Sequence, residues 1–206
     1  MIVAIVPAAG KSVRMGQSKL LLPLGPRCVI EHVLVALAGS QIDHMVVVVP
    51  PDATELVAVV RAHGAEAAQL PAPTADMRAS IVHGLDRAEQ LWGTGSLDAF
   101  LVALADQPTL SSRTIDHLTS RFRTSQQSIF VPTIGGRRGH PVLFAWKHAA
   151  GVRALPSDRG LNHLVAQMQM EVEECPIEEP GLLEDLDTPQ DYDRLKTRWN
   201  WGSRDY

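Results

Sequence analysis

Short apolar runs alternate with longer amphipathic stretches in the first half of the chain, and this alternation limits the fold more than any other feature. The apolar runs have the continuous hydrophobicity of parallel strands buried on both faces: residues 2–6, 45–49 and 99–105. The intervening stretches carry apolar side chains at helical spacing: residues 29–37, 56–60 and 81–88. Such alternation favours a mostly parallel sheet, with right-handed crossovers and helices on both faces.

The pattern is looser in the second half of the chain. Residues 129–132 and 142–144 are predicted to be strands on either side of a Gly-Gly-Arg-Arg-Gly turn. A final helix is predicted to begin with Thr188 as its N-cap, Pro189 in its first turn and Asp191 three residues after the cap. Because no repeat, low-complexity tract or linker interrupts the 206 residues, we expect one α/β domain.

Composition and charge exclude several classes of protein. With 45% apolar and 20% charged residues the chain is globular, and its net charge of −4 argues against a nucleic-acid binder, while a few local cations could still hold a small anion. The apolar N-terminus is broken at Pro7 and Gly10, so we expect no signal peptide, no membrane span and a cytoplasmic protein. Cys28 and Cys175 fit no metal or disulfide spacing and are expected to be ordinary thiols.

The first predicted strand runs directly into a loop of small residues that ends at Lys19 and also carries Lys11 and Arg14. Ligands of open α/β sheets bind beyond the carboxyl ends of the strands. Small side chains let backbone N–H groups approach a phosphate, and the cations neutralise its charge. The loop is neither a dinucleotide fingerprint nor a P-loop, because its glycines stand six apart and the spacing of Gly-Lys-Ser/Thr is absent. Spacing alone therefore leaves open a phosphate site and an ordinary surface loop.

The sequence VPAAGKSVRMGQSKLLLPLG resembles the signature loop of the MobA-like nucleotidyltransferases, AAGxSxRMGxxK, and most closely their molybdenum cofactor cytidylyltransferase (MocA-type) branch. Four further segments agree in the expected order, for the nucleobase pocket, the metal, the acceptor and the second metal: ADMRASIVHGL, ALADQP, GRRGHPVLF and EDLDTPQDY. The resemblance implies a single Rossmann-like domain over residues 1–206, with a mostly parallel mixed sheet. Nucleotide binding would belong to about residues 1–110 and acceptor binding to about residues 111–206.

The resemblance also implies roles for charged residues. Nucleotidyl transfer expels pyrophosphate from an NTP, so negative charge must be neutralised around the phosphates. Lys19 and Arg14 would hold the triphosphate and the leaving pyrophosphate, and would be catalytic together with Asp106. Asp106 stands where an apolar run ends and would bind Mg²⁺ or Mn²⁺, although it could instead be a helix N-cap or a turn residue. Asp187 and Asp185 are candidates for the second metal carboxylate, and Asp187 could instead only precede the helix.

Nucleobase and acceptor residues follow from the same resemblance. The backbone of Ala8, Ala9 and Gly10 would face the base, and Ser80 would bond its edge or simply pack in a helix face. His140 resembles the acceptor-side histidine of the family, and we assign it to binding rather than to general base catalysis.

Two departures bear on the substrates. Family members often carry a Gly-Asp-x-Gly-x-Arg segment on the acceptor side, whereas this chain has Ser-Asp-Arg-Gly-Leu-Asn, in which Arg159 is the candidate substitute. The loop begins with Val6–Pro7 in place of the usual leucine, and this proline is similar to that of the isoprenoid cytidylyltransferases.

The predicted reaction is the transfer of NMP, with CTP favoured over GTP, to a phosphorylated acceptor. The first choice of acceptor is molybdopterin carrying molybdenum, and the product would pass to a molybdenum enzyme. The alternatives are guanylyl transfer, cytidylyl transfer to another phosphorylated acceptor, or a catalytically idle carrier of the cofactor. The presence of both Lys19 and Asp106 counts against an idle carrier. A dinucleotide-dependent oxidoreductase would fit the alternation of strands and helices, but the glycine fingerprint is missing.

Overall fold

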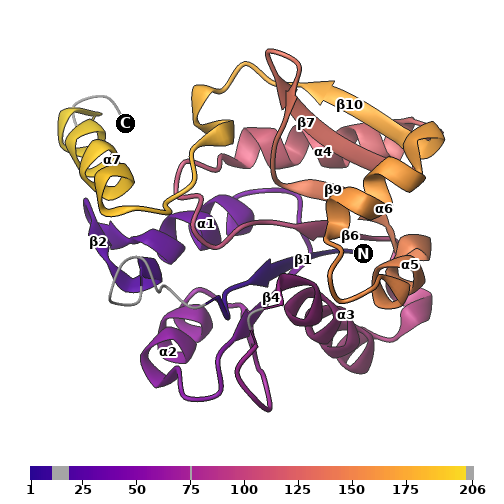
Figure 1. The fold of residues 1–206 in the computed structure, drawn as a ribbon, viewed down its shortest axis with the longest axis horizontal. Helices are drawn as coiled ribbons and strands as arrows, with labels where there is room; N and C mark the ends of the chain where they lie inside the picture. Colours follow the sequence, from indigo (N-terminus) through magenta and orange to yellow (C-terminus); the bar gives the residue numbers. More distant parts are fainter. Residues whose placement is uncertain (11–18, 75, 203–206) are drawn as a thin grey trace.

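A mixed sheet runs through the molecule, with helices on both of its faces (Figure 1). The computed structural model describes residues 1–10, 19–74 and 76–202. The strand order is β10-β7-β9-β6-β1-β4-β5, and the short β8 pairs with β7. The strands are β1 (Ile2–Pro7), β4 (His44–Val49), β5 (Glu66–Gln69), β6 (Ala99–Val102), β7 (Ile129–Ile134), β8 (Arg137–Arg138), β9 (Val142–Ala145) and β10 (Val172–Pro176).

The sheet is mostly parallel, as the sequence predicts. On the main strand path, β9 is antiparallel to both of its neighbours, and the other pairs are parallel. Strands β1, β6, β7 and β10 therefore share one carboxyl edge. The apolar run 99–105 is a strand only as far as Val102, because the chain turns after Ala103, whose N–H bonds the Ile5 carbonyl at 3.1 Å. This early turn moves Asp106 off the sheet and into the carboxyl-edge loops.

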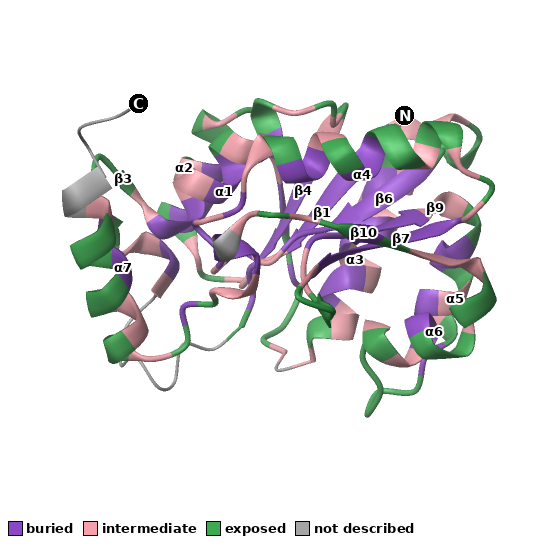
Figure 2. Cartoon of the chain, turned by 90° about the horizontal axis from the view of Figure 1, so that it is seen from above, coloured by how far each residue is buried: buried purple, intermediate pink, exposed green. Residues whose placement is uncertain are grey.

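Helices cover both faces of the sheet. They are α1 (Val29–Ala38), α2 (Thr54–Ala62), α3 (Met77–Trp92), α4 (Ser112–Thr124), α5 (Ala149–Ala154), α6 (Leu161–Gln167) and α7 (Pro189–Gly202). Helices α1, α2 and α4 pack on one face, and α3, α5 and α6 pack on the other. In β1, Ala4 and Val6 join the first core while Val3 and Ile5 join the second, so this strand is buried on both faces. Figure 2 shows the sheet as a buried layer between helices whose outer surfaces are exposed.

Helix α3 lies unusually close to the sheet. A Cβ added at Gly84 would stand 2.6 Å from Cγ2 of Ile5 and 3.0 Å from Cγ2 of Val48, so only glycine lets the helix approach β1 and β4 this closely. The helix begins at the carboxyl edge, where Asp76 caps it by accepting a 2.8 Å hydrogen bond from the N–H of Arg78. The start of α3 therefore lies at the same edge of the sheet as the end of β1.

Helix α7 begins as the sequence predicts and packs on a small hairpin formed by β2 (Pro23–Leu24) and β3 (Arg27–Cys28). At its start, the Thr188 hydroxyl donates to the Asp191 carboxylate at 2.7 Å and accepts from the Asp191 N–H at 3.2 Å. Leu24 of the hairpin and Leu195 of α7 belong to a third, smaller core. No helix in the described part of the chain is long and apolar enough to cross a membrane.

Candidate nucleotide-binding site

Lys19 lies between two aspartates at the carboxyl edge of the sheet. Its Nζ donates to Oδ2 of Asp106 at 2.5 Å and to Oδ1 of Asp187 at 3.1 Å. The side chains of Lys19 and Asp106 are 18% and 21% exposed, whereas that of Asp187 is 56% exposed. The cluster is therefore sheltered on one side and open to solvent, and to a ligand, on the other.

Three separate segments build this cluster. Lys19 opens the short 3₁₀ helix η2 (Lys19–Leu21), Asp106 lies in the turn after β6, and Asp187 directly precedes α7. Backbone groups join the segments as well: the Leu186 N–H bonds the Asp106 carbonyl at 3.1 Å, and Lys19 Nζ donates to the Leu186 carbonyl at 2.7 Å. Within the described residues, two carboxylates and a carbonyl thus hold the lysine.

The charges in the cluster depend on one another. Burial alone lowers the pKa of Lys19, but its hydrogen bonds and ionic contacts with Asp106 and Asp187 outweigh burial and raise that pKa above its ordinary value. Lys19 is therefore charged at neutral pH. Without a cation between them, the two carboxylates would repel each other in a partly desolvated place. The site accordingly requires positive charge at this point.

Asp185 has a different environment from Asp187. Burial, followed by the negative charges of Asp106 and Asp187, raises the pKa of the Asp185 carboxyl above its ordinary range. Its Oδ1 accepts a 3.0 Å hydrogen bond from Nε2 of Gln107. Of the two predicted candidates for a second metal carboxylate, only Asp187 shares a cation with Asp106 among the contacts of the described residues.

The residues of the cluster fit a magnesium or manganese ion that is held jointly with a nucleotide. No group of three or more His, Cys, Asp or Glu side chains within residues 1–10, 19–74 and 76–202 could hold a metal ion without other ligands. Asp106 and Asp187, however, converge on a single positive charge and offer hard oxygen ligands. Mg²⁺ in nucleotide enzymes is commonly bound by one or two carboxylates together with substrate phosphates. Two aspartates are enough for a site of that kind.

The predicted nucleobase residues lie at the ends of β1 and α3. Ala8 and Ala9 are buried, and the Ala8 N–H donates to the Val48 carbonyl at 2.8 Å, so that N–H is already engaged within the sheet. Gly10 is exposed, and a Cβ there would meet nothing within 4 Å. Ser80 is buried near the start of α3. Arg14 lies outside the described residues, so its predicted contribution stays a prediction.

The predicted acceptor residues lie apart from each other. His140 precedes β9, and its ring lies near the Val102 carbonyl at the end of β6. Burial lowers the pKa of His140 more than the Val102 carbonyl and the Asp106 charge raise it, so the ring is neutral at pH 7. Its buried Nδ1 has no partner in the part of the chain that the structure describes. Arg159 is exposed between α5 and α6, at the opposite end of the molecule from α7 (Figure 1), and pairs with the adjacent Asp158 at 3.6 Å.

Sequence reasoning missed Gln107 as an individual residue. It appeared only as part of the ALADQP motif, yet the structure buries it beside Asp106 and bonds it to the segment that carries Asp185 and Asp187. A polar side chain directly after the metal-motif aspartate, at the end of an apolar run, was the signal that could have drawn attention to it.

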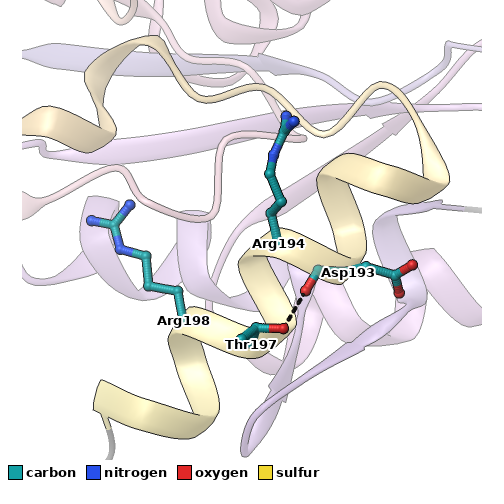
Figure 3. A pocket seen from close by; sticks show the side chains of 4 residues that line it. All are labelled: Asp193, Arg194, Thr197 and Arg198. Carbon is teal, nitrogen blue, oxygen red and sulfur yellow. Dashed lines mark hydrogen bonds between the residues drawn. The ribbon is translucent and has the colours of Figure 1, made fainter.

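A shallow hollow on the outside of α7 carries two arginines, each of which is paired with a carboxylate of this chain. It is lined by Asp193, Arg194, Thr197 and Arg198, and the Thr197 hydroxyl bonds the Asp193 carbonyl at 2.8 Å (Figure 3). Arg194 pairs with Asp191, and Arg198 contacts both carboxylate oxygens of Glu184 at 2.7 and 2.8 Å. Because both arginines are neutralised by carboxylates of this chain, the hollow is a poor phosphate site.

The chain is similar to known proteins over nearly its whole length. The curated protein PucB of Bacillus subtilis (strain 168), a purine catabolism protein, is 28% identical over 203 residues, covering 95% of this chain and 96% of PucB. A nucleotidyl transferase from Methanothermobacter thermautotrophicus, Mth528, is 22% identical, with a TM-score of 0.82 and 98% of each chain covered. Rv0371c of Mycobacterium tuberculosis H37Rv, solved as a complex with manganese, is 23% identical, with a TM-score of 0.77 over 95% of this chain and 98% of the other.

The family model for the MobA-like NTP transferase domain matches residues 4–172, a range that includes Lys19, Asp106 and His140. Asp185 and Asp187 lie beyond the matched range, in the segment that the structure folds back against Asp106. The structural relatives share the α/β fold with this chain, and the family match covers most of its length. The chain therefore belongs to the MobA-like NTP transferase family of nucleotidyltransferases.

Proposed function

We propose that this protein transfers CMP from CTP to a phosphorylated acceptor, molybdopterin carrying molybdenum, and releases pyrophosphate. The observation that carries the proposal is the cluster of Lys19, Asp106 and Asp187 at the carboxyl edge of the sheet. It joins an ammonium group for the phosphates to two carboxylates for a metal ion, next to the loop that resembles the family signature. The product would pass to a molybdenum enzyme.

The proposed chemistry is a displacement at the α-phosphorus. A phosphate oxygen of the acceptor forms the new P–O bond, and the bond to pyrophosphate breaks with its electron pair on the leaving group. Mg²⁺ or Mn²⁺ bound by Asp106 and Asp187 would supply positive charge to the phosphates. Lys19, and Arg14 from the same loop, neutralise the charge that develops on the departing pyrophosphate. His140 binds the acceptor through its neutral ring and transfers no proton.

Lys19 has two sets of partners in this proposal. Without nucleotide its ammonium group neutralises Asp106 and Asp187, with which it forms direct hydrogen bonds. With a triphosphate and a divalent ion bound, Asp106 and Asp187 would hold the ion, and Lys19 would turn to the phosphates. Because the ammonium and the ion compete for the same oxygens, metal and nucleotide binding should be coupled.

In this proposal, about residues 1–110 bind the nucleotide and about residues 111–206 bind the acceptor. Asp187 is the exception, since it comes from the second part but serves the metal of the first. Because a residue of the second part contributes to the site of the first, we propose a single functional domain over residues 1–206. Arg159 is also proposed to bind the acceptor. Its exposed guanidinium would contact a part of the acceptor that lies away from the reacting phosphate.

The preference for a pyrimidine can be tested by binding. CTP should bind at least about tenfold more tightly than GTP in the presence of Mg²⁺. Ser80, near the start of α3, would contact the edge of a small base, and the exposed Gly10 after β1 would let the backbone approach it. Isothermal titration calorimetry with CTP and GTP, each repeated with EDTA, measures both the base preference and the dependence on metal. Clearly tighter binding of GTP would assign the protein to guanylyl transfer instead.

A further inference from the structure

Gln107 is buried directly beside the proposed metal site. Only 3% of its surface is exposed. Its Nε2 atom donates two hydrogen bonds, to the Leu182 carbonyl at 2.9 Å and to Oδ1 of Asp185 at 3.0 Å. Both acceptors belong to the segment 182–187, which ends at Asp187. The Gln107 side chain, on the loop after β6, therefore holds the segment that carries Asp187, the second carboxylate of the proposed metal site.

The amide of Gln107 is held in one orientation at a cost. Its Oε1 atom is buried and has no hydrogen-bond partner within the described residues. Turning the amide over would satisfy nothing, because it would place oxygen against a carbonyl and a carboxylate, which are both acceptors. A buried polar atom without a partner is destabilising, so an apolar side chain would serve better if the position only filled space. The polarity of Gln107 therefore points to a specific task.

The task is to hold two carboxylates close to each other. Asp106 and Asp187 approach the same cation, and Asp185 adds a third carboxylate whose burial is already unfavourable. A neutral donor can hold such a segment without competing for the charge. An arginine or lysine in its place would pair with the carboxylates in competition with a metal ion, and a leucine would give them no hydrogen bond. An amide meets both requirements.

We propose that Gln107 is a positioning residue for the metal site: it fixes the segment 182–187 against the loop after β6, so that Asp187 could hold a divalent ion jointly with Asp106. This inference rests on the proposed metal-dependent function. Gln107 acts through Asp185 and the Leu182 carbonyl and does not touch the ion. The backbone bond from Leu186 to Asp106 adds to the same attachment.

Thr109 offers a matched control in the same contact. Its hydroxyl donates to the Gly181 carbonyl at 2.8 Å, so it joins the loop after β6 to the residue that directly precedes the segment 182–187, but it bonds neither Asp185 nor the residues after it. Thr109→Val removes this bond with little change in shape. If the contact matters only for folding, Thr109→Val and a Gln107 variant should behave alike. If Gln107 positions the carboxylates, only the Gln107 variant should affect the metal.

The experiment uses the whole 206-residue chain. Electron paramagnetic resonance measures its affinity for Mn²⁺ with CTP bound, and a separate titration in EDTA measures its affinity for CTP. Gln107→Met, similar in size and shape, should weaken Mn²⁺ binding by about 10- to 100-fold, the range typical for removing an outer partner of a metal ligand. Affinity for CTP in EDTA should stay within about twofold, and Thr109→Val should leave both affinities within about twofold. Gln107→Asn keeps the amide one methylene shorter and should lose at least about threefold in Mn²⁺ affinity, a readout that remains if the methionine variant folds poorly.

Two results would overturn the inference, and they differ from a failure of the proposed function. Mn²⁺ affinities of the Gln107 variants equal to that of the wild type would remove the positioning role while leaving the metal site intact. An equal loss in Thr109→Val would make the contact purely structural. If the wild-type protein with CTP bound no Mn²⁺ at all, the metal-dependent function itself would fail, and the role of Gln107 with it.

Discussion

Asp106→Asn should lower the rate of pyrophosphate release by at least about two orders of magnitude, which corresponds to about 2.7 kcal/mol of transition-state stabilisation. Asparagine keeps the shape of the side chain and removes its charge. The proposed metal site would then have one carboxylate instead of two, and Lys19 would lose the partner at 2.5 Å that holds it most closely. The measurement is single-turnover pyrophosphate release with CTP, Mg²⁺ and acceptor.

Asp98 provides the matched control. It precedes β6, whereas Asp106 follows that strand. Its side chain is 72% exposed and pairs with the N-terminal ammonium at the amino edge of the sheet, opposite the carboxyl edge that carries Lys19. Asp98→Asn should leave the rate within about twofold of the wild type. EDTA should abolish activity in the wild type, and added Mg²⁺ or Mn²⁺ should restore it. Turnover that survives both EDTA and Asp106→Asn would disprove the metal mechanism.

Lys19→Met should reduce the single-turnover rate by about 10²- to 10³-fold, as expected for the loss of a group that stabilises charge in the transition state. Binding of CTP should weaken by less than about tenfold, because the lysine is proposed to act most strongly on the departing pyrophosphate. Methionine keeps much of the aliphatic stem. Its main side effect is that Asp106 and Asp187 lose their ammonium partner, so the variant should be less stable than the wild type and should regain stability when Mg²⁺ is added.

Lys147→Met controls for the loss of a positive charge elsewhere. Lys147 is 62% exposed and pairs with Glu171 at 2.7 Å, at the edge of the sheet where β9 ends. This variant should keep the wild-type rate within about twofold. Nucleotide titration and pyrophosphate release are measured on all three proteins. Equal losses of affinity and rate in Lys19→Met would mean that the lysine only holds substrate. If the protein were only a carrier, Lys19→Met would weaken nucleotide binding, and none of the three proteins would release pyrophosphate.

The first half of the fold could be predicted because its core is built from local patterns. Apolar runs gave β1, β4 and β6, and helical spacing gave α1, α2 and α3. Strand β10, by contrast, contains Glu173 and Glu174 and shows no apolar run; its pairing with β7 over residues 129–133 makes it a strand. Strand β5 has two polar ends and depends in the same way on its pairing with β4. Tertiary pairing of this kind leaves little trace in a single sequence.

The members of the candidate site could be named from the sequence, but not their contacts. Lys19, Asp106 and Asp187 were predicted for the phosphates and the metal. Their meeting depends on the fold, since Lys19 and Asp187 are 168 positions apart in the chain. The choice between Asp185 and Asp187 likewise requires the packing of Gln107, which no spacing rule describes. Arg14, predicted from the same loop as Lys19, lies outside the described residues.

The most direct test of the account is a single-turnover assay of the wild-type protein with Mg²⁺, molybdopterin carrying molybdenum, and each NTP in turn. We expect pyrophosphate to appear in stoichiometric amount with CTP, together with a cytidine dinucleotide product, and much more slowly with GTP. Omission of the acceptor or addition of EDTA should stop the release. No pyrophosphate from any NTP, with metal and acceptor both supplied, would contradict the assignment of this protein as a nucleotidyltransferase acting on that acceptor.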